Sequence, residues 1–192
     1  MGFLSVLSFA QKLVAERARP GEPVIDATVG GGVDTLFLAG QAGAGGVVYC
    51  FDIQREALER AQQRLAGADA ASLAEVRWTE GSHAGMEAAV DPQHRGRIAA
   101  VMFNLGYLPG SDHATVTVPE STLPALDAAL RLLRPGGLIT AVLYTGHAGG
   151  QREADAVEAW AQALPQRDCQ VLRYQFANQR SHPPYLLAIE KR

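Results

Sequence analysis

Hydrophobic positions along the chain follow two periods, one typical of helices and one typical of buried strands. Apolar residues from Leu4 to Val14 recur at helical spacing until Arg19-Pro20-Gly21, which predicts a helix over about residues 3–18. Short runs rich in β-forming residues predict seven strands, at residues 23–27, 47–51, 74–79, 97–103, 138–144, 169–174 and 185–190. Amphipathic stretches between them predict further helices, at residues 34–39, 55–65, 119–133 and 150–163.

This alternation of strands and helices predicts an α/β fold with a mostly parallel seven-stranded sheet and helices on both faces. The run at 97–103 is apolar on both faces, as a central parallel strand must be. The last strand follows its predecessor without a helix, so we expect it to be antiparallel. The length of 192 residues fits a single domain over 1–192.

Composition narrows the class of protein further. The net charge of -3 argues against a broad nucleic-acid-binding surface. Cys50 and Cys169 are far apart in sequence, and the five histidines lack metal-ligand spacing, so we predict neither a disulfide framework nor a metal site. The apolar N-terminus lacks the basic region of a signal peptide, and no apolar run is long enough for a membrane span. We therefore expect a soluble cytoplasmic protein with no membrane partner.

The end of the first strand carries a glycine turn between two carboxylates. Ligands of doubly wound sheets bind beyond the carboxyl ends of the strands, and glycines let the backbone approach them. Carboxylates disfavour a pyrophosphate but suit a ligand with an ammonium and a sulfonium group. The candidate cofactor-binding residues of this turn are Asp26, Thr28, Gly30, Gly32, Asp34 and Thr35. The alternative is a tight turn with a helix cap.

Asp52 ends the second strand twenty residues beyond Gly32, where an acidic side chain can accept both hydroxyls of a ribose. We therefore predict an adenosine site, to which Ile53 and Gln54 also belong. Ser82 and His83 follow the third strand and would lie beside the adenine, although a plain polar loop explains them nearly as well.

The fourth strand ends in Asn104-Leu105-Gly106-Tyr107, an Asn-x-x-Tyr arrangement like the Asn/Asp-Pro-Pro-Tyr of amino-group methyltransferases, without its prolines. Asn104, which we also place at the cofactor, and the Leu105 carbonyl can accept the hydrogens of an amine, and Tyr107 can stack on a planar base. The alternative is an asparagine helix cap and a core tyrosine. Tyr144 and His147 end the fifth strand, where His147 could contact the substrate or receive a proton, or be a loop histidine.

Four motifs occur in order: Asp26-Ala-Thr-x-Gly-x-Gly-x-Asp-Thr35, Phe51-Asp-Ile-Gln54, Phe103-Asn-Leu-Gly-Tyr-Leu-Pro-Gly110 with Asp112, and Tyr144-x-Gly-His-x-Gly-Gly150. Together they resemble the small bacterial family labelled rRNA methylases, whose members include the MnmM-type tRNA methyltransferases.

The resemblance implies a Rossmann-like class I methyltransferase, S-adenosylmethionine as the donor, and a homodimer. It also implies methylation of the aminomethyl group on the modified wobble uridine, in the anticodon region of tRNA. The substrate pocket would then be formed by Tyr107, Pro109, Gly110, Asp112, Tyr144 and His147.

Three other functions remain open at this point. The acidic charge balance and the lack of an appended RNA-binding domain are compatible with a methyltransferase of a small aromatic or amine metabolite. Methylation of rRNA is a second alternative. A donor-binding protein without catalysis is a third, although binding alone does not require an amine cradle at Asn104.

Overall fold

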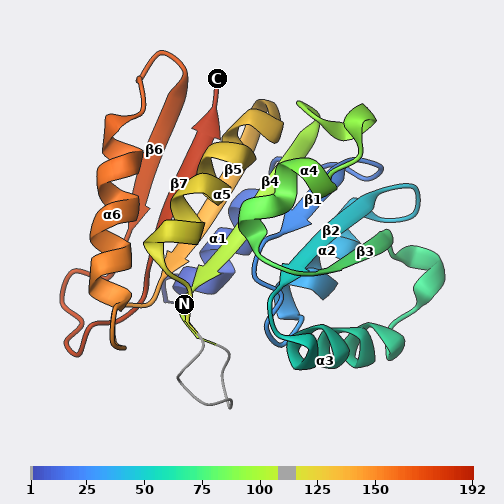
Figure 1. Ribbon diagram of the computed structural model, residues 1–192, viewed down its shortest axis with the longest axis horizontal. Coiled ribbons are helices and arrows are strands. Elements are labelled where there is room, and N and C mark those ends of the chain that lie inside the picture. Colours follow the sequence, from blue (N-terminus) through green and yellow to red (C-terminus); the bar gives the residue numbers. More distant parts are fainter. Residues whose placement is uncertain (1, 108–115) are drawn as a thin grey trace.

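The computed structural model describes residues 2–107 and 116–192 (Figure 1). The strands in this part of the chain are β1 (Pro23–Asp26), β2 (Val47–Asp52), β3 (Glu75–Glu80), β4 (Ile98–Leu105), β5 (Leu133–Leu143), β6 (Cys169–Tyr174) and β7 (Tyr185–Lys191). The α-helices are α1 (Val6–Ala15), α2 (Val33–Ala42), α3 (Arg55–Ala66), α4 (Met86–Ala89), α5 (Pro119–Leu132) and α6 (Gly150–Ala163). Short 3₁₀ turns lie at Ala70–Ser72, His83–Gly85 and Pro92–His94.

All seven strands form one sheet in the order β3-β2-β1-β4-β5-β7-β6. β1 pairs in parallel with both β2 and β4, while β7 lies antiparallel between β5 and β6. The predicted sheet, mostly parallel with an antiparallel last strand, is therefore confirmed. The order reverses at β1, so the crevice expected of a doubly wound sheet lies between β1 and β4.

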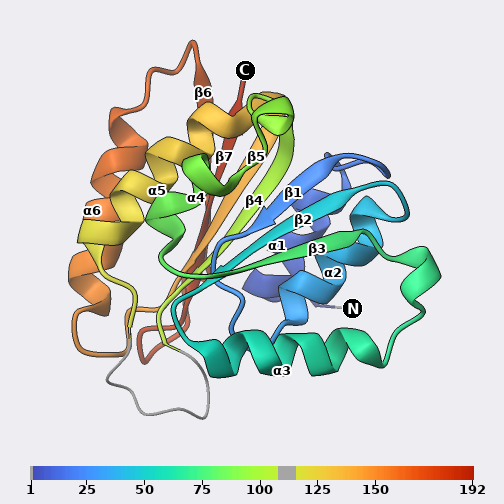
Figure 2. The same ribbon diagram turned by 45° about the vertical axis from the view of Figure 1, so that its right-hand side comes forward.

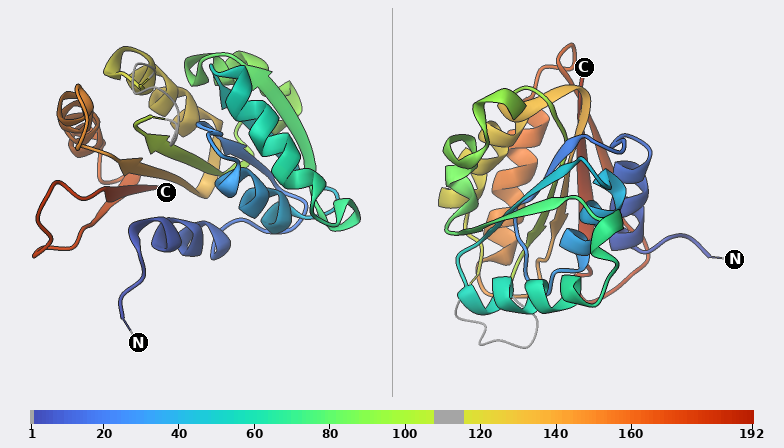
Figure 3. Two further views of the ribbon diagram at one scale, coloured as in Figure 1. Left: turned by 90° about the horizontal axis from the view of Figure 1, so that it is seen from below. Right: turned by 90° about the vertical axis from the view of Figure 1, so that its right-hand side faces the viewer.

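Helices cover both faces of the sheet, as predicted (Figure 3). Helices α4, α5 and α6 pack on one face through buried residues such as Met86, Leu126 and Val157. Helices α1, α2 and α3 pack on the other face through residues such as Val14 and Leu38. β4, apolar on both sides, contributes to both cores, which is why its sequence lacks the alternation of a half-exposed strand.

The first helix is shorter than predicted. Ser5 caps its N-terminus by accepting a hydrogen bond from the Ser8 backbone N–H at 3.1 Å, and the helix ends at Ala15. The apolar side chains of Val6, Ala10 and Val14 are buried against the sheet. The prediction of residues 3–18 was too long at both ends, because hydrophobic spacing continues beyond the residues that have helical hydrogen bonds.

β5 begins five residues earlier than predicted. Leu133 pairs with Ile98, and the pairing register then shifts before Ala100 meets Leu138. Gly136 has a φ of 69°, and a Cβ on Gly137 would lie 2.9 Å from the Arg134 carbonyl oxygen. Gly136 and Gly137 therefore form an irregularity inside the strand, since only glycine fits the positive φ and the close approach.

The carboxyl ends of β1, β2 and β4 lie at one edge of the sheet (Figure 2). The chain passes from β2 into α3 at this edge, and from β1 through the glycine turn into α2. Among residues 2–107 and 116–192, no helix has the length and apolar character needed to cross a membrane.

Candidate functional site

A cavity of about 530 Å³ lies beyond the carboxyl ends of β1, β2 and β4. Its size lies within the range of pockets that hold a nucleotide-sized small molecule. The residues that line it include two sets, one around the end of β2 and one around the end of β4. The β2 group consists of Gly30, Asp52, Ile53, Gln54, Ser82 and His83, and the β4 group consists of Gln11, Asp34, Asn104, Tyr107 and Tyr144.

The glycine turn and Asp52 form the centre of the β2 group. Gly30, at a φ of 51°, donates its backbone N–H to Oδ2 of Asp52 at 2.9 Å. The Gln54 backbone N–H donates to Oδ1 of the same carboxylate at 2.9 Å. Each carboxylate oxygen has a second lone pair, so Asp52 is held in place and can still accept hydrogen bonds from a ligand in the cavity.

The rest of the β2 group is apolar or neutral. Ile53 is 57% exposed although it is a large aliphatic residue, and it lies on the cavity. Burial lowers the pKa of His83, so its ring is neutral at physiological pH. Its Nδ1 lies 3.2 Å from the Ala27 carbonyl oxygen and therefore carries the proton. Nε2 is then a buried acceptor without a partner in the described chain.

Hydrogen bonds link three side chains of the β4 group, which come from three different elements. Asn104 of β4 donates Nδ2–H to Oδ2 of Asp34 at 2.7 Å, and Gln11 of α1 donates Nε2–H to Oδ1 of Asp34 at 2.7 Å. Asp34 stands in the first turn of α2, where the helix dipole favours a negative charge. The Oδ1 atom of Asn104 is buried and has no partner among the described residues.

Aromatic side chains complete the β4 group. Tyr107 forms an antiparallel bridge with Val116, and Tyr144 packs at Gly106, where a Cβ would lie 3.2 Å from the Tyr144 Cβ. Burial raises the pKa of Tyr144, with smaller contributions from the charges of Asp34 and Tyr107. These two aromatic rings lie on the cavity close to Asn104, as expected for residues that contact a planar substrate.

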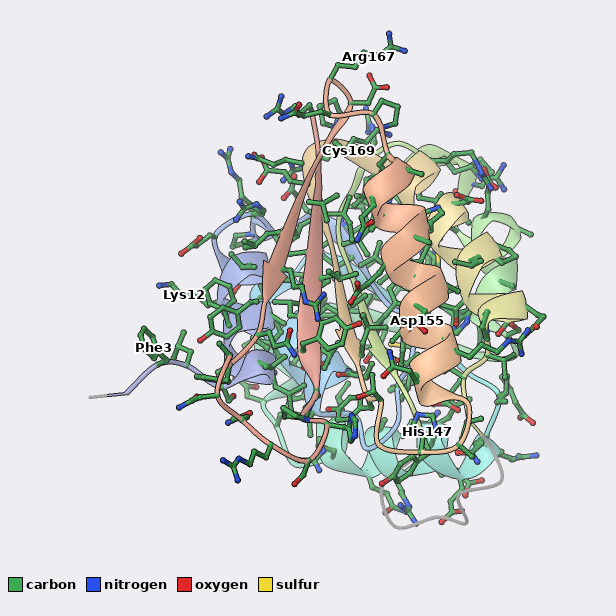
Figure 4. All side chains as sticks on the ribbon, turned by 90° about the vertical axis from the view of Figure 1, so that its left-hand side faces the viewer. Phe3, Lys12, His147, Asp155, Arg167 and Cys169 are labelled. Carbon is green, nitrogen blue, oxygen red and sulfur yellow. The ribbon has the colours of Figure 1, made fainter. Side chains whose placement is uncertain are left out.

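His147 is not among the residues that line the cavity. Its ring meets the Tyr107 ring edge-on, with centroids 5.5 Å apart and an interplanar angle of 87°. Figure 4 shows His147 near the start of α6, where the chain arrives from β5. The structure thus places His147 against Tyr107, which lines the cavity, and a direct contact of His147 with the substrate stays a prediction.

Asp26 and Thr35 lie behind the cavity, not on it. The Asp26 side chain is fully buried, and its carboxylate accepts hydrogen bonds from Thr35 Oγ1 at 2.5 Å and the Thr28 N–H at 3.2 Å. Burial, and secondarily the charge of Asp34, raises the pKa of Asp26 to about 7. Neither residue is among those that line the cavity, and Asp26 points into the turn that it organises, so a direct contact of either with a cofactor stays a prediction. Thr28 does line the cavity.

Gly32 and Leu105 are not among the residues that line the cavity. A Cβ on Gly32 would lie 2.6 Å from Cα of Ala61, so this glycine permits α2 and α3 to approach and does not line the cavity. The Leu105 carbonyl accepts the backbone N–H of Tyr144 at 3.1 Å as part of the sheet. Asn104 lines the described part of the cavity, and the Leu105 carbonyl oxygen keeps a second lone pair, so its contact with an amine stays a prediction. Pro109, Gly110 and Asp112 lie outside the described residues.

Several residues that line the cavity could not be predicted from the sequence. Leu7 and Gln11 come from α1, Val116 and Thr117 follow β4, and Ser121 belongs to α5. None of them occupies a motif position, and their approach depends on how the helices cross the sheet. Within the described ranges, no group of three or more His, Cys, Asp or Glu side chains is arranged to hold a metal ion.

The protein has a Rossmann-like fold of the class I methyltransferase type. This class is defined by the sheet order, by the antiparallel β7 and by the cavity at the carboxyl ends of β1, β2 and β4. Residues 48–190 match the family described as "Putative rRNA methylase", and the chain belongs to this family.

Individual relatives agree with this assignment. A protein of Clostridium thermocellum with the same description is 37% identical in sequence and superposes with a TM-score of 0.92 over 100% of both chains. A methyltransferase of Streptococcus mutans, solved in complex with S-adenosylhomocysteine, is 31% identical, with a TM-score of 0.87 over 99% of both chains. The chloroplastic tRNA (mnm(5)s(2)U34)-methyltransferase of Arabidopsis thaliana is 41% identical over 178 residues, which are 90% of this chain. The match spans 64% of the plant protein's length.

Proposed function

We propose that this protein is an S-adenosylmethionine-dependent N-methyltransferase. Its substrate would be the aminomethyl group of the modified wobble uridine, in the anticodon region of tRNA. The product would be 5-methylaminomethyluridine or its 2-thio counterpart. The observation that carries the proposal is a cavity lined by Asp52, whose carboxylate is suited to a ribose, and by Asn104, whose buried amide oxygen has no partner among the described residues and is suited to an amine.

The residues of the β2 group fit the donor. Asp52 retains lone pairs for the two ribose hydroxyls, Ile53 offers an apolar surface to a purine, and Nε2 of His83 is a buried acceptor that lacks a hydrogen. When bound, S-adenosylmethionine supplies an electrophilic methyl group. The relative from Streptococcus mutans was solved with the product form of this cofactor, which supports the assignment.

The residues of the β4 group fit an amine. Oδ1 of Asn104 can accept one N–H of a neutral primary amine and so fix the direction of the nitrogen lone pair. Tyr107 and Tyr144 offer rings to the uracil that carries the amine. Catalysis would come mainly from this alignment, which is worth about 7–11 kcal/mol in favourable cases. The name of the plant relative supports this substrate.

The substrate can be tested with purified protein and labelled S-adenosylmethionine. We expect tRNA from cells that lack the protein to be methylated, with 5-methylaminomethyl(-2-thio)uridine detected by mass spectrometry of its nucleosides. Ribosomal RNA from the same cells and a small-molecule extract serve as competing substrates. Methylation of either of these without methylation of tRNA would overturn the proposed substrate, and donor binding without any transfer would overturn the proposed activity.

We further propose that the protein acts in the cytoplasm. Cys50 and Cys169 are buried free thiols, which fits a reducing compartment. Cell fractionation followed by immunoblotting tests this location, and recovery of the protein from another compartment would contradict it.

We also propose that the protein is a homodimer. Phe3 is 87% exposed and lies at the N-terminal end of α1 (Figure 4), next to Leu4 and Leu7, which are each 42% exposed. Its ring meets the Phe176 ring at a centroid distance of 6.5 Å. Exposed apolar side chains that adjoin one another favour burial against a second copy. Light scattering should give twice the monomer mass, and Phe3→Asp should lower it.

A further inference from the structure

The amide of Asn104 has two possible orientations, and they differ in what they present to the cavity. With Oδ1 turned away from Asp34, the side chain offers an acceptor to an amine, whereas with Nδ2 turned away from Asp34 it would compete with the amine as a donor. The two orientations have nearly the same shape, so packing alone does not select between them. A chemical constraint from a neighbouring group must select one.

Asp34 supplies such a constraint. A carboxylate accepts hydrogen bonds and donates none, so the half of the Asn104 amide that faces it must be Nδ2, which lies 2.7 Å from Oδ2 of Asp34. The opposite orientation would place two acceptor oxygens against each other inside a buried site, where repulsion is strong. Oδ1 of Asn104 is then left as the buried atom without a partner.

Asp34 is itself held in place from a second direction. Gln11 of α1 donates Nε2–H to the other carboxylate oxygen, Oδ1, at 2.7 Å. The Asp34 side chain is only 7% exposed, so these bonds are shielded from competing water. The backbone of Asn104 is fixed separately, because its N–H donates to Oγ1 of Thr28 at 2.7 Å. What remains adjustable in Asn104 is its side chain, and the bond to Asp34 restrains it.

We propose that Asp34 and Gln11 are positioning residues that hold the amide oxygen of Asn104 toward the substrate amine. This inference rests on the proposed function for its catalytic consequence, whereas the orientation itself is a property of the protein alone. The hydrogen bonds run from α1 through α2 to β4, so the N-terminal helix takes part in aligning the nucleophile. A fixed acceptor favours a nucleophile that has an N–H to donate over an anionic oxygen nucleophile, which has none.

The orientation can be tested in the ligand-free protein by NMR of side-chain amides. The Asn104 signals are assigned by their absence in Asn104→Asp. In the unaltered protein we expect one pair of signals, with the proton bonded to Asp34 shifted downfield. Asp34→Asn should remove this shift, because a neutral amide can face Asn104 with either its oxygen or its nitrogen. Gln11→Met should reduce it.

Gln41→Met is the matched control for Gln11→Met. Gln41 of α2 also contacts the end of α1, donating to the Ala15 carbonyl oxygen at 3.4 Å and to the Ala18 carbonyl oxygen just beyond the helix at 2.8 Å, but it does not line the cavity. We expect Gln41→Met to leave the Asn104 signals unchanged. If it moves them as much as Gln11→Met does, the effect comes from general loosening of α1, and the proposal is overturned for Gln11.

The catalytic consequence is a fall in kcat. Asp34→Asn should lower kcat roughly 10- to 100-fold, as expected for loss of a charged hydrogen-bond partner, and Gln11→Met about fivefold. Gln11→Met should leave the dissociation constant of S-adenosylhomocysteine unchanged. The double variant Asp34→Asn with Asn104→Asp keeps one donor and one charged acceptor across the pair, so it should recover part of the activity that each single change removes.

The two measurements separate the possible failures. If the purified protein methylates no tRNA but the Asn104 signals respond as described, the proposed function is wrong and the positioning is right. Unchanged Asn104 signals in both Asp34→Asn and Gln11→Met would overturn the positioning, whatever the activity. A double variant no more active than the weaker single variant would overturn the pairing of Asp34 with Asn104.

Discussion

The β2 group and the β4 group line one cavity but are held together by different kinds of contact. In the β2 group, the Asp52 carboxylate is held by backbone N–H groups of Gly30 and Gln54. In the β4 group, Asp34 is held by side-chain amides that come from positions 23 and 70 residues away. Backbone donors survive most substitutions, whereas side-chain donors do not. The β2 group should therefore tolerate changes around its key carboxylate, and the β4 group should not.

Asp26 lies behind both groups. Its replacement has the largest expected effect, which is on the free energy of unfolding. Its pKa rises from 3.8 in the unfolded chain to about 7 in the folded protein, so between these values the folded state binds the proton more tightly. Stability should therefore fall as pH rises through this window. Asp26→Asn removes the titration. We therefore expect the free energy of unfolding of the variant, relative to that of the unaltered protein, to rise by roughly 3 kcal/mol from pH 5 to pH 8. Urea unfolding at the two pH values measures this, and equal pH slopes for both proteins would contradict it.

Asn104→Ala breaks the β4 group alone. We expect kcat for methyl transfer to fall roughly 100-fold, because the amine loses the acceptor that aligns it. The dissociation constant of S-adenosylhomocysteine, measured by calorimetry, should stay nearly the same. Loss of cofactor binding in proportion to the loss of rate would instead place Asn104 in the cofactor site and remove the distinction between the two groups.

Asp52→Ala breaks the β2 group alone. The two ribose hydroxyls lose a charged acceptor, which should weaken S-adenosylhomocysteine binding by about 2 kcal/mol. Calorimetry measures the change, with circular dichroism as the check that the fold is intact. An unaltered dissociation constant would remove Asp52 from the site and leave the glycine turn as a structural feature only.

Substitutions of Tyr107 have the smallest expected effect, and two of them separate the role of the ring from that of the hydroxyl. Tyr107→Phe keeps the stacking surface, so activity should stay near normal. Tyr107→Ala should raise KM for tRNA by a factor that corresponds to about 1 kcal/mol, at the low end for base stacking because the ring is already 37% exposed. Equal damage from both substitutions would instead assign a role to the hydroxyl.

The sequence was most informative where a residue's role depends on its immediate neighbours. The strands could be predicted because buried parallel strands require continuous apolar runs, and β2 and β4 were located to within a residue or two. Asp52 could be predicted as a site residue because it ends a strand at a fixed spacing from a glycine turn, and it lies on the cavity. Strand ends share one edge of a parallel sheet, so chain order alone brings these side chains together.

Tertiary structure decided which strand-end residues face the cavity. Asp26 and Asp34 looked equivalent in sequence as carboxylates flanking one turn, but Asp26 points inward to Thr35, and Asp34 points to Asn104. Gln11 had no sequence signal, because its contact depends on the packing of α1 across the sheet. Gly32 looked like a ligand glycine, and the close approach of Ala61 shows a packing role. Side-chain direction after a strand depends on the local turn, and contacts between distant helices depend on the whole core. Sequence therefore determined the strand ends as the place of the chemistry, and the packed structure determined which atoms present it.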